Sequence, residues 1–154
     1  MLDEFDTALN MVLVDTFRLI LKAEEQMLKS AGRMNLSISE VHLIEAVGKQ
    51  KEGRTISDIA EDLDITLPSV TIAINRLLKK EYVEKTKRDG DGRMVFVTLT
   101  EAGQKINRVH QYFHKQMIRD ISHELSHDEK LIFIKGMNRI NCFFEQKSSS
   151  MEEK

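Results

Sequence analysis

Residues 55–80 constrain the fold of this chain most strongly, because they contain two helix starts close together. Thr55-Ile-Ser-Asp58 places a carboxylate three residues after a threonine, a capping pattern that predicts a short helix over 56–63. Thr66-Leu-Pro-Ser69 predicts the start of a second helix, because proline is tolerated in a first helical turn. Two short helices separated by a tight break are typical of a helix-turn-helix.

The chain then continues into a predicted β-hairpin. Tyr82–Lys85 and Met94–Val97 are rich in β-branched and aromatic residues, as strands are. Asp89-Gly-Asp-Gly92 lies between them, and glycine supplies the positive φ angles that tight hairpin turns need. Two short helices followed by a hairpin predict a winged helix-turn-helix, which places one helix in a DNA groove and the hairpin against the neighbouring backbone.

The charge of the chain is distributed unevenly. The formal net charge is −2, yet between Arg76 and Arg93 basic residues outnumber acidic ones by seven to four, which leaves −5 for the rest. This pattern fits a regulator that contacts phosphate through one face, and fits an ordinary solvated surface equally well. Under the first interpretation the phosphate contacts come from Lys79, Lys80, Lys85, Lys87 and Arg88.

The predicted second helix is amphipathic. Its apolar stripe, expected to be buried, is formed by Val70, Ile74, Leu77 and Leu78. The residues expected to face away from the core are Ser69, Thr71, Ile72, Asn75, Arg76 and Lys79.

Four further helices are predicted around this module. Apolar residues recur at helical spacing over 3–31, and capping patterns at Ser37, Thr100 and Ser126 begin helices that reach about 49, 121 and 144. The terminal helices carry more apolar surface than so small a module can cover, and exposed apolar surface of this kind marks an interface. A two-fold dimer would bury it and place two recognition helices about one DNA turn, roughly 34 Å, apart.

The predicted fold class is therefore mainly α, an α+β winged helix with six helices and a β-hairpin wing. We expect a single domain over 1–147, with residues 38–100 as the DNA-binding lobe. Segments 1–33 and 101–147, from both termini, are expected to form a helical dimerisation region. The segment 148–154 is rich in Ser, Glu and Lys and is expected to be a disordered tail.

Cys142 is the only cysteine, so no intrachain disulfide can form and a cytoplasmic setting is expected. It lies between Ile140 and Phe143 on an apolar helix, which favours an inert packed thiol. The apolar run near the start is interrupted by Asp15 and Arg18, well short of the roughly 20 residues that a membrane span needs. We therefore expect no membrane partner.

No catalytic residues stand out in the sequence. Ser126-His-Asp128 contains the residue types of a catalytic triad, but in consecutive positions, whereas triad members assemble in space. The serine is better explained as a helix cap. We expect no enzyme activity.

Three groups of residues in the winged helix-turn-helix carry a family signature. They are Ile56-Ser-Asp-Ile-Ala60, Ser69-Val-Thr71 with Asn75-Arg-Leu77, and Asp89-x-Asp91-x-Arg93 followed by Val97-Thr-Leu-Thr100. Through these motifs the chain resembles the MarR family of bacterial winged-helix repressors over nearly its whole length. The resemblance implies a homodimer that binds double-stranded DNA at a pseudopalindromic operator and represses by blocking polymerase.

The resemblance also implies roles for individual residues. Carried over by position, the major-groove residues are Ser69, Val70, Thr71, Asn75 and Arg76. Arg93 would reach the minor groove from the wing, positioned by Asp91. The chain departs from the family pattern at Glu81, where glycine is usual, and at Ile72, where a polar residue is common. Ile72 would either contact thymine methyl groups or lower the affinity.

Within the family, the strongest likeness is to the fatty-acid-biosynthesis repressor of Gram-positive bacteria. It lies in Ile38-Ser-x-x-x-His42-x-Ile44, in Val47-Gly-Lys49 and in Val109-His-x-x-Phe-His-Lys-x-Met117. This likeness implies an effector with a long acyl chain, presented on acyl carrier protein, and no other cofactor.

Histidines and glutamates are predicted to converge beneath the DNA-binding lobe. His110 and His114 lie one helical turn apart on one face, while His42 and Glu24 belong to the second and first helices. The preferred interpretation is an effector cavity without a metal, lined by Glu24, His42, His110, His114, Phe17, Leu21 and Phe113. The alternative is a zinc-responsive repressor, because the same glutamate and three histidines resemble the site of zinc-sensing family members.

Overall fold

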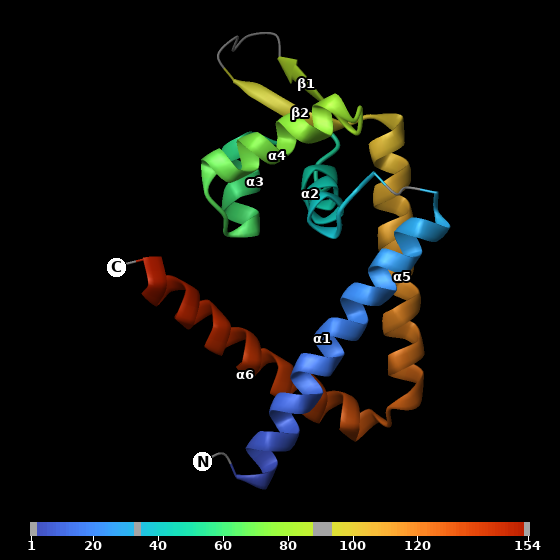
Figure 1. Cartoon of the computed structure of the whole chain (residues 1–154), viewed down its shortest axis with the longest axis vertical. Helices are drawn as coiled ribbons and strands as arrows, with labels where there is room; N and C mark the ends of the chain where they lie inside the picture. The colour runs from blue at the N-terminus through green and yellow to red at the C-terminus, as the bar shows by residue number, and fades with distance from the viewer. Residues whose placement is uncertain (1–2, 33–34, 88–93, 153–154) are drawn as a thin grey trace. The chain divides into compact units, whose positions relative to one another are not determined.

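The computed structural model describes residues 3–32, 35–87 and 94–152. The chain divides into two compact units, 1–113 and 114–154, which are described separately below. The elements are α1 (Glu4–Ser30), α2 (Ile38–Gly48), α3 (Ile56–Leu63), α4 (Leu67–Lys79), β1 (Val83–Lys87), β2 (Val95–Leu99), α5 (Glu101–Glu124) and α6 (His127–Glu152) (Figure 1). The described residues therefore form the predicted fold class, a mainly α winged helix with six helices and one hairpin.

The predicted helix caps are present. In front of α2, Ser37 Oγ accepts from the Glu40 amide while the Glu40 carboxylate accepts from the Ser37 amide. Thr55 and Asp58 make the same reciprocal pair in front of α3. Each pair satisfies two amides that a helix start otherwise leaves without partners, so the sequence encodes these boundaries locally.

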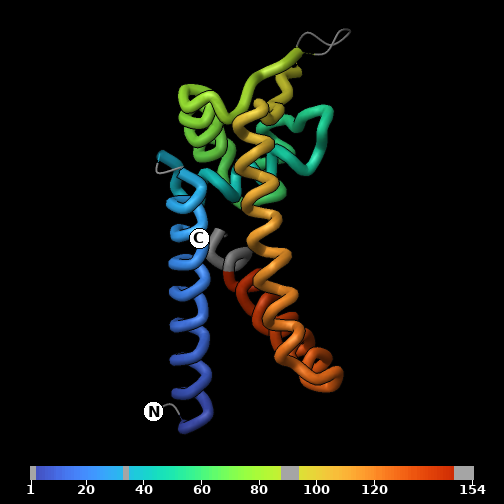
Figure 2. Tube along the Cα trace, turned by 90° about the vertical axis from the view of Figure 1, so that its right-hand side faces the viewer, coloured from blue at the N-terminus to red at the C-terminus, as the bar shows by residue number. Residues whose placement is uncertain are grey.

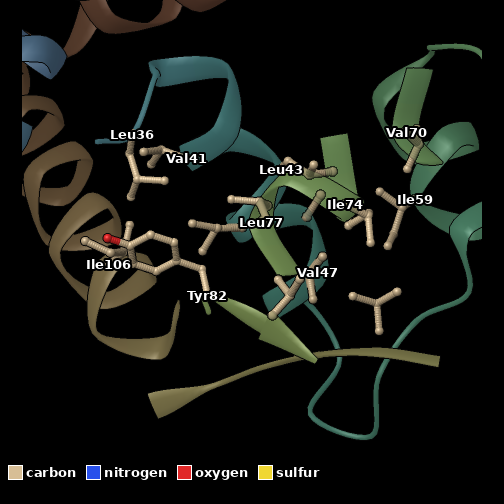
Figure 3. Close-up of a cluster of buried hydrophobic side chains, with 14 of the residues drawn as sticks. Leu36, Val41, Leu43, Val47, Ile59, Val70, Ile74, Leu77, Tyr82 and Ile106 are labelled. Atoms are coloured by element: carbon tan, nitrogen blue, oxygen red, sulfur yellow. The ribbon is translucent and has the colours of Figure 1, made fainter. Parts of the chain in front are cut away.

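The core of the first unit is built mainly from α2, α3, α4 and the hairpin, and it also includes Leu28 of α1 and Ile106 of α5 (Figure 3). Val70, Ile74 and Leu77 of α4 are fully buried, and so are Ile59 of α3 and Val47 of α2. Three fully buried side chains on one stripe fix the rotation of α4 about its own axis. The opposite side of α4 consequently faces solvent.

The hairpin is antiparallel, with Val83 opposite Leu99 and Lys87 opposite Val95. Both strands begin one residue later than predicted and end two residues later. A third segment joins the sheet at Arg54, whose main chain exchanges two hydrogen bonds with Val97, of 3.0 and 2.8 Å. The base of the wing is thus attached to the segment between α2 and α3.

A single residue, Thr100, separates β2 from α5. Figure 2 shows the trace passing directly from the wing into the start of the long helix that follows it. Its amide donates to Tyr82 O at 3.2 Å and its hydroxyl donates to Glu81 O at 2.7 Å. Gly103, in the first turn of α5, lies so close to Tyr82 that an added Cβ would overlap the Tyr82 carbonyl oxygen. This joint is therefore tightly packed and hydrogen-bonded on both sides.

Glu81 adopts a left-handed conformation, with φ of 62°, at the turn between α4 and β1. A side chain in this region costs about 1–2 kcal/mol, and glycine avoids that cost while losing more entropy on folding. We expect Glu81→Gly to raise the free energy of unfolding by about 0.5–1 kcal/mol in a denaturant titration. Glu84→Gly, within β1, should lower it instead; equal effects of the two substitutions would show that the conformation of Glu81 is not strained.

The second unit contains the end of α5 and all of α6. The predicted cap of α6 is present, because Ser126 Oγ accepts from the Glu129 amide and the Ser126 amide donates to the Glu129 carboxylate. α5 ends three residues beyond the predicted boundary. α6 continues to Glu152, so the prediction of a disordered tail from Ser148 is not what the structure shows. Among the described residues no helix combines the length and hydropathy needed to cross a bilayer.

Candidate nucleic-acid interface and effector site

The outward side of α4 carries most of the residues predicted to contact DNA. Ser69, Asn75, Arg76 and Lys79 are exposed there, together with Ile72. Thr71 is half-buried, and its hydroxyl donates to Leu67 O at 2.9 Å within the helix. Because α4 begins at a solvent-facing N-terminus and the core fixes its rotation, this side is available to a groove.

Val70 is a correction to the predicted interface. Its side chain is 0 % exposed and packs in the core near Ile59 (Figure 3). The signature Ser69-Val-Thr71 thus mixes one buried residue with two outward ones, as helical periodicity requires. Val70 supports the helix from behind and cannot contact a base.

Lys80 is a second correction. Its ammonium donates to both carboxylate oxygens of Glu40, at 2.7 and 2.8 Å, and also to Asn35 O. Burial raises the pKa of Glu40, but the hydrogen bonds from Lys80 and Ser37 outweigh it and leave the pKa below its usual value. This lysine therefore ties the end of α4 to the start of α2 and is not available to a phosphate.

Lys85 connects the wing to the outward side of α4. Its ammonium donates to Asn75 Oδ1 at 3.2 Å, although the two residues belong to β1 and α4. Lys87, at the end of β1, is exposed as predicted. The predicted wing residues Arg88, Asp91 and Arg93 lie outside the described residues.

Arg54 was not predicted to matter, yet it is the best-connected buried cation among the described residues. Its guanidinium donates to Asp62 Oδ2 and to Ala46 O, both at 2.8 Å, and to Asp58 O at 3.0 Å. Lys49 also donates to the Asp62 carboxylate, and hydrogen bonds from Lys49 and Arg54 hold the Asp62 pKa below its usual value. With its main chain paired to β2, Arg54 joins α2, α3 and the wing.

Three members of the predicted glutamate–histidine cluster, Glu24, His42 and His110, lie together in the first unit. Glu24 of α1 is buried, and its Oε1 lies 3.4 Å from Nε2 of His42 on α2 and 3.3 Å from Nε2 of His110 on α5. Nδ1 of His110 lies 2.9 Å from Oε2 of Glu45 on α2. One buried carboxylate therefore connects three helices. Glu45 lies one helical turn after His42 in α2, and this position brings its carboxylate to His110.

Two predicted members of the site lie at the boundary between the units. Phe113 is half-buried and is the last residue of the first unit. His114 is half-buried and begins the second unit, one helical turn after His110 in α5. In the second unit Cys142 is exposed, so the expectation of a packed thiol was wrong for the single chain.

A cavity of about 760 Å³ lies between α1 and the start of α2. Its apolar lining comes from Phe17, Leu21, Leu28, Leu36 and Ile38, and its polar lining from Glu25, Lys29, Ser37, Ser39 and His42. Phe17, Leu21 and His42 were predicted, whereas Glu24 and His110 are absent from the lining. Lys29 and residues 36–39 were missed, because only the folded chain brings the start of α2 against α1.

Comparison with known proteins gives consistent results. Residues 34–94 match the family model described as MarR family. Transcriptional regulator AdcR of Streptococcus pyogenes is 30% identical over 110 residues, covering 69% of this chain and 72% of AdcR. Regulator YhjH of Bacillus subtilis is 27% identical over 85 residues, covering 55% of this chain and 48% of YhjH. The chain spans only about half to three-fifths of the length of three such curated relatives.

The fold also matches solved structures. Streptococcus pneumoniae FabT, solved in complex with DNA, superposes with a TM-score of 0.84 at 33% sequence identity, covering 91% of this chain and 97% of FabT. AbsC of Streptomyces coelicolor, described as a MarR family transcriptional regulator, superposes with a TM-score of 0.75 at 18% identity and supports the fold alone.

Proposed function

This chain belongs to the MarR family of DNA-binding transcriptional regulators, and we propose that it is a homodimeric repressor whose operator affinity is set by a long acyl chain. The observation that carries the ligand proposal is the cavity between α1 and α2. Its volume of about 760 Å³ falls within the range of roughly 300–1,000 Å³ typical of small-molecule sites.

The lining of the cavity suits an acyl chain with a polar end. Leucine, isoleucine and phenylalanine side chains form one part of the wall, which favours an extended hydrocarbon by removing it from water. Glu25, Lys29, His42 and two serines form the other part, where the lysine, the histidine and the serines can donate hydrogen bonds to an ester or acid group. Presentation of the chain by acyl carrier protein remains part of the proposal.

The cavity is linked to the DNA-binding lobe through α1. Leu21 and Leu28 of this helix line the cavity, and Glu24 between them contacts His42 and His110. A ligand that fits one position of α1 better than another would shift the population between arrangements of α2 and α5. The operator affinity would change with that shift, since α2 forms the base of the lobe.

The dimer proposal is supported by exposed apolar side chains on the terminal helices. On α1 these are Phe5, Met11, Val12, Val14 and Phe17, and on α6 they are Leu131, Ile132, Phe133, Ile134, Phe143 and Phe144. Large apolar surfaces on a single chain mark interaction sites, and a two-fold dimer is the commonest solution.

The genes proposed as targets are those of fatty-acid synthesis. Support comes from the sequence likeness in residues 38–49 and 109–117 and from the structural similarity to FabT at 33% identity. An acyl effector would then report the supply of the end product to the repressor.

The test is operator binding by the purified protein with acyl carrier protein loaded with acyl chains of increasing length. We expect longer chains to tighten binding. Leu21→Trp should obstruct part of the cavity and weaken this response while leaving ligand-free binding unchanged, because Leu21 is a half-buried wall residue. Gln26→Trp, on the same helix but outside the cavity, should respond like the wild type. A response that does not depend on chain length, or that Leu21→Trp retains in full, would refute the acyl proposal. The conclusion that the protein binds DNA would still stand.

A zinc-responsive repressor is the second candidate, because one observation favours it. Oε1 of Glu24 lies 3.3–3.4 Å from Nε2 of both His110 and His42. Neighbouring ligands of a tetrahedral zinc with bonds of about 2.0 Å are separated by roughly the same distance. About one zinc per subunit after mild purification, with operator affinity that depends on His42 and His110, would establish the metal sensor and overturn the acyl proposal.

A further inference from the structure

The side of α4 that faces solvent can be assigned residue by residue. Val70, Ile74 and Leu77 are each 0 % exposed and define the buried side. An α-helix turns about 100° per residue, so Ile72 lies about 200° from Val70, diametrically opposite the buried stripe. Ile72 is 55 % exposed. The outward side is therefore apolar at Ile72, and the exposed Lys79 lies on nearly the same line two turns further along the helix.

The neighbours of Ile72 on this side are polar. Asn75 and Arg76 lie one turn further along the helix, to either side of it, and both are exposed. The side-chain oxygen of Asn75 accepts from Lys85, so the side-chain amide of Asn75 can still donate. Arg76 can only donate. The polar part of this side thus offers donors, and Ile72 alone offers a purely hydrophobic contact at its centre.

The major groove of DNA presents one hydrophobic group, the C5 methyl of thymine. We propose that Ile72 recognises a thymine methyl in each half of the operator and is the residue that makes this regulator prefer thymine at that position. The inference rests on α4 being the recognition helix of the proposed DNA interface. It is independent of the acyl effector.

The experiment removes the methyl group from the DNA and the side chain from the protein. An operator is first selected from a random duplex library, and each thymine is then replaced by deoxyuridine, which lacks only the methyl. We expect one thymine per half-site at which this replacement weakens wild-type binding about fourfold, since burying one methyl-sized group strengthens binding by about that amount. When both half-sites are changed, the loss should be about 15-fold.

Ile72→Ala should bind the thymine and deoxyuridine operators equally, because the side chain that detects the methyl is absent. The variant should fold normally, since Ile72 is exposed, and its thermal unfolding verifies this. Leu67→Ala is the matched control, because Leu67 is 52 % exposed but lies about 60° from Val70, on the buried half of α4. It should keep the full methyl effect.

Two results would overturn the proposal. In one, no deoxyuridine replacement weakens wild-type binding. In the other, Ile72→Ala loses affinity uniformly and still discriminates thymine from deoxyuridine. A library from which the wild type selects no sequence would refute sequence-specific binding through α4 as well, which is a distinct and recognisable outcome.

Discussion

Arg54→Met is expected to lower the free energy of unfolding by about 3 kcal/mol, because it removes a buried cation that donates to a carboxylate and two carbonyl oxygens. Methionine keeps much of the stem's volume, so the loss reports the hydrogen bonds rather than a cavity. The measurement is a urea titration at one fixed protein concentration, because dimer formation makes stability depend on concentration.

Lys49→Met is the matched control, since Lys49 binds the same Asp62 carboxylate but its side chain is 53 % exposed. Exposed ion pairs contribute little, and we expect a loss below about 1 kcal/mol.

The pH dependence of stability gives an independent check. The folded-state pKa of Asp62 is lowered, so its ion pairs stabilise the protein above its unfolded pKa of about 3.9 and lose that effect as pH falls below it. The difference between wild type and Arg54→Met should therefore shrink in acid, and equal losses in the two variants would contradict the buried anchor.

Among the described residues, Arg76→Ala should have the largest effect on DNA binding. Arg76 is exposed on the outward side of α4, and a bidentate arginine–guanine contact is worth about 1–3 kcal/mol. A dimer makes the contact twice, so we expect the preference for operator over unrelated DNA to fall by about 100-fold or more. The measurement is competition between the two DNAs at constant salt.

Lys80→Ala serves as the comparison for Arg76→Ala. Because the Lys80 ammonium is held by Glu40 and Asn35, its removal should cost stability at the start of α2 while the salt dependence of DNA binding stays unchanged. A shallower salt dependence in Lys80→Ala would show that this lysine leaves Glu40 to contact phosphate. Operator preference retained in Arg76→Ala would exclude Arg76 as a base contact.

The features that the sequence predicts well are encoded within a few neighbouring residues. The start of α3 follows from Thr55 and Asp58 alone, and its predicted range, 56–63, agrees with the structure. The start of α4 likewise follows from Thr66 at the N-cap and Pro68 in the first helical turn. Capping and periodicity act over one or two turns, so a single sequence contains the information that they need.

The features that the sequence misses depend on partners far along the chain. Lys80 reads as a surface cation until Glu40, forty residues earlier, is brought against it. Arg54 reads as a loop residue until α3 and β2 fold around it. Val70 illustrates a different error: a motif carried over as a block included a position that helical periodicity alone assigns to the core.

The one-residue joint between β2 and α5 has a mechanical consequence. Thr100 is hydrogen-bonded to both Glu81 and Tyr82, and Gly103 packs directly on Tyr82. The backbone at this joint therefore cannot bend easily when α5 moves. Only Lys80 and Glu81 separate Tyr82 from the end of α4. We therefore expect the start of α5 and the wing to move as one rigid body. A tilt of α5 near His110 would therefore displace the wing and α4 together, without being reduced by movement at the joint.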